Sequence, residues 1–257
     1  MEERTELQGG FSMNNVLKKG VSGILLLGAL LVLPQAADAK VAPGHYERVN
    51  AAGLVNGTLD VFETQGKQFF DVHAYSYEGT DPRQVTTGMA DNVITAGPVT
   101  EDTFKITNSC YQGKIDPNSD VIRRYEYRNM DVAYKVTEKE NAVVLEPEAA
   151  AVKVDIAGEY RRAGDVPQSS YIMAEALIDS IDPQVTGIPQ NQELRYVYDK
   201  ENLYDGVKYP GAGAIGPCYK VKIYTEKTLQ LQESFLVPMA MQDVYKIAYD
   251  NSVTKIY

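Results

Sequence analysis

Alternating apolar and polar residues dominate the first half of the chain after residue 40. In such runs every second side chain points to the same side, which is typical of a β-strand with one buried face. Turn residues such as Asn56-Gly57 and Gly97-Pro98 separate the runs. Short strands spaced by about 8–12 residues, with turns between them, indicate an antiparallel barrel or sandwich. The predicted strands are 59–62, 68–77, 104–106, 122–127, 132–136, 142–145 and 152–156.

A repeated motif brackets these runs. The pattern Gly-x-Tyr-x-Arg occurs at 44–48 and again at 158–162. A first and a last strand of similar sequence can pair and close the sheet, which removes the exposed edges that invite aggregation. Coincidence is the alternative, because the motif is short and Tyr is abundant. We predict a mainly β fold that begins with a small antiparallel β-barrel of about eight strands over residues 40–163. This barrel is similar in outline to calycin and lipocalin barrels.

The pattern changes after a linker at 164–168. Ser169 or Ser170 can cap a helix whose apolar positions recur at helical spacing from Tyr171 to Ile181, and Asp182-Pro183 ends it. A helix followed by antiparallel strands predicts an α+β module over residues 164–257, with one face of the sheet packed on the helix. The predicted strands are 194–198, 219–224, 229–237, 244–249 and 253–257.

The N-terminal segment predicts export. Lys18 and Lys19 precede the uncharged run 21–33, and Ala37-Asp38-Ala39 provides small residues for cleavage. The run is shorter than the about 20 apolar residues of a spanning helix. We therefore expect a signal peptide over 1–39, with Met13 as an alternative start, and a secreted or periplasmic product without a stable membrane span. A retained anchor is the alternative.

Charge and cysteine content limit the partners and suggest a cross-link. The formal net charge of −10 at pH 7 disfavours nucleic acid, because an acidic surface repels phosphate. The chain has 2 cysteines, Cys110 and Cys218, and in an oxidising compartment an even pair favours a disulfide. Such a bond would join the two modules. Two buried thiols are the alternative.

Motifs for cofactors, metals and catalysis are incomplete. The segment 211–216 reads G-x-G-x-x-G, but a strand-like run follows it where a nucleotide site needs a helix. The segment 116–127 begins like an EF-hand loop but has Val121 and Tyr127 at the Gly and Glu positions. His45 and His73 fall in predicted strands. We predict no cofactor, no metal site and no catalytic residue.

Tyrosine is the most distinctive residue of the chain, with 18 copies and no Trp. Tyrosine suits binding surfaces because it offers amphipathic contact area at low entropic cost, but it also suits ordinary strands. The candidate binding surface consists of Tyr196, Tyr198, Tyr219, Tyr224 and Tyr245.

These observations favour an exported, non-catalytic binding or envelope-associated protein. Two alternatives stay open. One is a secreted inhibitor of a hydrolase such as lysozyme, to which an acidic surface would be complementary. The other is a cell-wall hydrolase that uses a carboxylate pair, since glycosidases need only two carboxyl groups at the correct separation.

Overall fold

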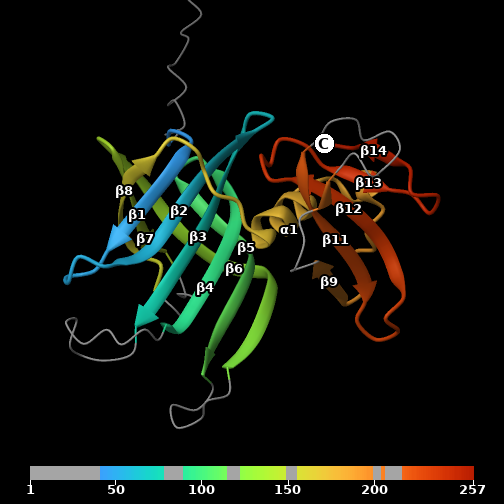
Figure 1. Ribbon diagram of the computed structural model, residues 1–257, viewed down its shortest axis with the longest axis horizontal. Helices are drawn as coiled ribbons and strands as arrows, with labels where there is room; N and C mark the ends of the chain where they lie inside the picture. The colour runs from blue at the N-terminus through green and yellow to red at the C-terminus, as the bar shows by residue number, and fades with distance from the viewer. Residues whose placement is uncertain (1–40, 78–88, 115–121, 149–154, 199–203, 206–215) are drawn as a thin grey trace, which may run out of the picture. The chain divides into compact units, whose positions relative to one another are not determined.

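A closed antiparallel barrel of eight strands and a second antiparallel sheet with a buried helix form the described chain (Figure 1). The computed structural model describes residues 41–77, 89–114, 122–148, 155–198, 204–205 and 216–257. The predicted signal peptide, the segment 116–120 and most of the glycine motif at 211–216 lie outside these residues.

The barrel confirms the predicted fold class. Each strand pairs antiparallel with the next, and the last pairs with the first. The strands are β1 Gly44–Val49, β2 Val55–Thr64, β3 Lys67–Tyr77, β4 Met89–Thr100, β5 Thr103–Lys114, β6 Ile122–Lys139, β7 Ala142–Pro147 and β8 Gly158–Gly164.

Two strand predictions were wrong. Gly97-Pro98 does not end a strand but forms an irregularity inside β4, where the register with β5 shifts between Ala96 and Val99. A Cβ on Gly97 would lie 1.9 Å from the carbonyl oxygen of Lys105, so the close approach of two backbones requires glycine. The runs 122–127 and 132–136 are one strand, β6, because a register shift lets it continue beside β5.

The two Gly-x-Tyr-x-Arg motifs close the barrel, as the repeat predicts. β1 and β8 pair antiparallel, with Tyr46 opposite Arg162. Tyr46 and Tyr160 are both buried in the barrel core. Their hydroxyls donate to main-chain carbonyls four residues earlier, those of Ala42 and Ile156, each at 2.7 Å.

Apolar side chains fill the barrel interior. Alternate residues in the middle of β2 and β3 point inward and are fully buried: Leu59, Val61, Phe70, Val72 and Ala74. Phe70 and Phe104 contact each other with ring centroids 5.4 Å apart. A core of aromatic and β-branched side chains stabilises the barrel through apolar burial.

The second sheet follows the barrel in the chain. Its strands are β9 Leu194–Tyr198, β10 Tyr204–Asp205, β11 Pro217–Thr225, β12 Leu231–Pro238, β13 Tyr245–Ile247 and β14 Val253–Lys255. β11 is central: β12 pairs along one side of it, and β9 and β10 pair with different parts of it. A short helix, α2 (Pro183–Thr186), precedes β9 and ends at Gly187, whose φ of 76° is left-handed.

The helix α1 (Tyr171–Asp179) joins the barrel to the second sheet (Figure 1). Seven consecutive residues, Ile172 to Ile178, are buried, because the helix contacts β3, β4 and β5 of the barrel as well as β11. One hydrophobic cluster contains Phe62 and Phe69 from the barrel exterior, α1, and Phe235 from β12. The helix therefore packs on two sheets rather than on one. Among the described residues, no helix combines the length and the apolar content needed to cross a membrane.

The predicted disulfide between Cys110 and Cys218 is absent from the structure. Both residues are buried thiols. Cys110, on β5, belongs to the cluster around α1, whereas Cys218, on β11, belongs to a second cluster with Leu236 and Ile247 on the other face of the sheet. The sheet itself separates the two sulfurs, and shared apolar packing joins the modules instead.

Candidate functional site

A cleft of about 1000 Å³ lies where the barrel meets the second sheet. We call it the junction cleft. It is lined by four residues of β6 between Arg124 and Arg128, by the C-terminal end of α1, by residues of the segment 181–193, and by all of β9. This volume is in the range of small-ligand and peptide sites.

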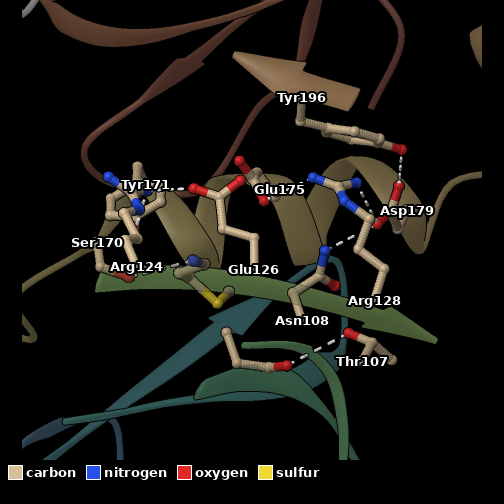
Figure 2. A network of polar contacts seen from close by, with 12 residues as sticks. Thr107, Asn108, Arg124, Glu126, Arg128, Ser170, Tyr171, Glu175, Asp179 and Tyr196 are labelled. Atoms are coloured by element: carbon tan, nitrogen blue, oxygen red, sulfur yellow. Dashed lines mark hydrogen bonds and ion pairs between the residues drawn. The ribbon is translucent and has the colours of Figure 1, made fainter. Parts of the chain in front are cut away.

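Arg124 forms the first polar cluster at the cleft (Figure 2). It projects from β6, and its Nη1 donates to the Tyr198 hydroxyl at 2.9 Å and its Nη2 to the Tyr171 hydroxyl at 2.5 Å. The rings of Tyr171 and Tyr198 stack with centroids 3.7 Å apart, and the guanidinium lies 4.8 Å from the Tyr171 centroid. Glu126 pairs with the same guanidinium. An arginine held between aromatic rings and a carboxylate is fixed in position.

Arg128, also on β6, forms the second cluster with residues that lie one helical turn or more beyond Tyr171 on α1. Figure 2 shows its guanidinium among Glu175, Asp179 and the ring of Tyr196. Nη2 donates to Glu175 Oε2 at 2.8 Å, and Nη1 lies 3.5 Å from Asp179 Oδ2. Asp179 also accepts from the Tyr196 hydroxyl and, at 2.9 Å, from the amide of Asn108. The barrel, α1 and β9 each contribute to this network.

Burial controls the protonation of this network. Burial raises the pKa of the Glu175 carboxyl to about 8, and the charge of Arg128 offsets only part of that rise. Glu175 is 1% exposed, and its Oε1 has no hydrogen-bond partner among the described residues. Burial likewise raises the pKa of the Tyr196 hydroxyl, so it stays protonated as the donor to Asp179. Glu175 is thus a buried acid beside the cleft rather than in its lining.

The structure divides the candidate tyrosine surface. Tyr196 and Tyr198, on β9, line the junction cleft together. Tyr219, on β11, donates to the main-chain carbonyl of Ser169 at 2.7 Å near the start of α1. Tyr224 pairs in register with Arg195, and Tyr245 packs with the cluster on the far face of the sheet. Only the first two belong to the cleft.

A second polar group connects the barrel to the start of α1. Asp60 and Asp71 are opposite each other on β2 and β3 and are almost completely buried. Asp60 accepts from His45 at 2.8 Å and from the backbone of Gln168 at 2.7 Å, and Asp71 accepts from the backbone of Ser170 at 2.8 Å. Burial raises the pKa of Asp60 to about 6. These carboxylates anchor the chain as it enters the helix.

The histidines have structural partners in this group. His45 bonds to Asp60, and His73 lies 3.6 Å from Asp71. In the part of the chain that the structure describes, no three His, Cys, Asp or Glu side chains are grouped to hold a metal ion.

Arg124, Arg128, Glu175 and Asp179 are not among the residues that the sequence pattern predicts as a site. Arg124, Glu126 and Arg128 alternate along β6, which places them on one face of the strand. Glu175 and Asp179 are four residues apart on the apolar helix, and so share a face. These two spacings were the available signals, but only the fold shows that the two faces meet.

Comparisons with family models, with curated proteins and with solved structures give no match for this chain.

Proposed function

We propose that this protein is exported and acts as a non-catalytic binding protein whose ligand occupies the junction cleft. The observation that carries the proposal is the cleft itself, about 1000 Å³ in volume and lined by polar and aromatic side chains held in place by buried partners. Pre-organised side chains favour binding, because less conformational freedom is lost when the ligand docks.

Export is the part of the proposal that rests on the sequence 1–39. It is tested by expressing the full chain in a bacterium with a periplasm and sequencing the N-terminus of the product in each fraction. A product beginning at Lys40 in the periplasm or medium supports export. Full-length protein confined to the cytoplasm would refute it.

Ligand binding in the cleft is tested by thermal shift with fractionated envelope peptides, glycans and lipids. A ligand at 100 times its Kd stabilises the folded state by about 2.7 kcal/mol, which raises Tm measurably. Val197 lines the cleft and is 41% exposed, so Val197→Trp fills it. Val49, 55% exposed and not among the cleft residues, provides the matched Val49→Trp control. The proposal fails if no fraction raises Tm, or if both variants respond as the wild type does.

A second candidate function is hydrolysis by Glu175 and Asp179. The raised pKa of Glu175 beside a second carboxyl group favours it, because general acids often have this environment. Its weakness is that Glu175 does not line the cleft. Release of soluble fragments from purified cell walls at pH 5–8, lost in Glu175→Gln, would support hydrolysis. The inhibitor hypothesis stays a prediction, which lysozyme assays with excess protein can test.

A further inference from the structure

We propose that the ligand of the junction cleft is an uncharged oligosaccharide, held by hydrogen bonds to exposed side chains of the cleft lining. This inference rests on the proposed binding function and names the class of ligand. It depends on the charge balance of the lining, on the covering of its aromatic rings, and on the hydrogen-bonding groups that the folded chain itself leaves unused.

The charges on the inner wall of the cleft cancel one another. The guanidinium of Arg124 pairs with Glu126, and that of Arg128 pairs with Asp179. Glu175 adds little negative charge behind Arg128, because burial raises its pKa to about 8 and the carboxyl keeps its proton at pH 7. This wall therefore attracts neither a cation nor an anion.

The remaining charged side chains of the lining balance as well. The ammonium of Lys227 lies 3.9 Å from the carboxylate of Glu193. Arg195 and Glu226 then remain, one of each sign. The net charge of −10 of the whole chain is thus not concentrated in the cleft. A charged ligand would lose hydration here without meeting a net opposite charge, so the lining favours an uncharged ligand.

A purely apolar ligand does not suit the lining either. The ring of Tyr196 is covered by the guanidinium of Arg128, and the ring of Tyr198 stacks on Tyr171 with the centroids 3.7 Å apart. Apolar residues such as Leu194 are interspersed with charged residues along the cleft. An apolar ligand would remove water from these charges without replacing its hydrogen bonds. The ligand therefore needs polar groups as well as apolar surface.

Exposed side chains of the lining have unused hydrogen-bonding groups. Gln192, Arg195 and Glu226 are exposed, and within the described residues their side chains have no hydrogen bond or ion pair. They provide an amide, a guanidinium and a carboxylate, and each of these planar groups has at least two hydrogen-bonding atoms. Neighbouring hydroxyl groups of a sugar can engage both atoms of such a group, because a hydroxyl both donates and accepts.

The backbone brings these side chains to one end of the cleft. The N–H of Glu226 donates to the carbonyl of Glu193 at 2.8 Å, and Gln192 directly precedes Glu193 in the chain. Arg195 follows on β9, after Leu194, which can contact the C–H face of a sugar ring. The volume of about 1000 Å³ is at the upper end of the range for small-ligand sites, which leaves room for more than one sugar ring.

The experiment uses the purified full chain and hexasaccharide probes, with binding measured by calorimetry. The neutral probes are cellohexaose, maltohexaose and chitohexaose. The charged probes are the hexamer of glucosamine, which is cationic, and the hexamer of glucuronic acid, which is anionic. We expect at least one neutral probe to bind and both charged probes to bind at least tenfold more weakly. Tighter binding of either charged probe, or no binding of any neutral probe, would overturn the proposal.

Protein variants locate the binding. We expect Gln192→Ala and Arg195→Ala each to weaken binding of the neutral probe at least tenfold. The matched controls are Gln184→Ala and Arg161→Ala, which change exposed residues outside the cleft lining and should bind as the wild type does. All four positions are exposed, so the variants should fold, which circular dichroism checks. Wild-type affinity in both cleft variants would contradict the inference.

The outcomes separate this inference from the binding function on which it rests. If no neutral probe binds while an envelope peptide or lipid raises the Tm of the wild type but not of Val197→Trp, the oligosaccharide inference is wrong and the binding function stands. If neither the probes nor any envelope fraction binds in the cleft, both are wrong.

Discussion

The guanidinium of Arg162 lies over the ring of Tyr46, 5.5 Å from its centroid, and so connects the last barrel strand to the first. The reverse contact is also present, because Arg48 lies 5.4 Å from the centroid of Tyr160. The arginine of each Gly-x-Tyr-x-Arg motif thus covers the tyrosine of the other motif. The closure of the barrel has an approximate two-fold symmetry.

The glycines of the two motifs allow each arginine to reach across to the other motif. Arg162 donates to the carbonyl of Pro43, just before Gly44, at 3.0 Å, and Arg48 donates to Ala157, just before Gly158, at 2.5 Å. Both glycines have positive φ, 155° and 131°. A Cβ at Gly44 would lie 2.7 Å from the carbonyl oxygen of Gly164 and 3.0 Å from the Arg162 guanidinium, so a side chain there would disturb both the pairing of β1 with β8 and the position of the arginine.

We predict that Arg162→Met lowers the free energy of unfolding, since it removes charged hydrogen bonds to the carbonyl of Pro43 and to the hydroxyl of Tyr46. The adjacent Arg161 has a side chain that is 79% exposed, so Arg161→Met should change stability by less than about 0.5 kcal/mol. Urea unfolding followed by circular dichroism measures both. Equal effects of the two substitutions would show that the crossed contacts do not stabilise the closure.

The start of α1 gives a second prediction. Ser170 caps the helix, because its side chain accepts from the backbone of Met173 at 3.2 Å. Ser170→Ala should lower the free energy of unfolding by about 1 kcal/mol. The control is Ser169→Ala, because the carbonyl of Ser169, not its side chain, accepts the strong hydrogen bond from Tyr219. If Ser169→Ala lowers the free energy of unfolding more than Ser170→Ala does, Ser170 is not the cap of the helix.

Glu175 makes stability depend on pH. Its pKa rises from an ordinary 4.5 to about 8 in the folded chain because of burial, so the folded state retains a proton that the unfolded state has released. Stability is therefore lost as pH rises between these two values, by up to about 1.4 kcal/mol per pH unit.

Glu175→Gln removes this titration. We expect the free energy of unfolding of the wild type to fall more steeply with pH than that of the variant between pH 5 and 8. The exposed Glu138 provides the control, because Glu138→Gln should leave the wild-type slope unchanged. Parallel curves for wild type and Glu175→Gln would contradict the raised pKa.

The cysteines give a fourth prediction. Cys110 and Cys218 are buried thiols, and burial raises the pKa of the Cys110 thiol, which slows its reaction further. Non-reduced protein should react slowly with a thiol reagent when native and release 2 thiols per chain in denaturant, as its sequence contains. The Cys218→Ala variant should release half as much. Absence of reactive thiols in denatured wild type would refute this arrangement.

The barrel could be predicted from the chain because its signals are local. Most alternating runs and the repeat around Tyr46 and Tyr160 are read within short windows and match an observed strand or pairing. The predicted strand 152–156 does not, because residues 155 and 156 lie in no strand and 152–154 lie outside the described residues. β4 was missed because Gly97-Pro98 resembles a turn in isolation. Only the neighbouring strand shows why a glycine is needed inside β4, since the carbonyl of Lys105 occupies the space of a side chain.

The junction cleft could not be predicted in the same way. Arg128 and Glu175 are 47 positions apart in the chain and Asp179 lies on the next turn of the helix, yet one guanidinium contacts both carboxylates. Their proximity depends on how α1 packs between the barrel and the second sheet. The hydrophobic effect that drives this packing is non-directional. A local sequence pattern therefore shows that a face is apolar, but not which other face will pack against it.

The sequence by itself determined most of the strands, the helix, and the pairing that closes the barrel, because these depend on side-chain periodicity and on backbone requirements of individual residues. The tertiary structure decided that Cys110 and Cys218 point to separate clusters, that Glu175 holds its proton, and that β6 and β9 face each other across a cleft. These properties arise from distance and burial between segments far apart in the chain, and such quantities exist only once the chain has folded.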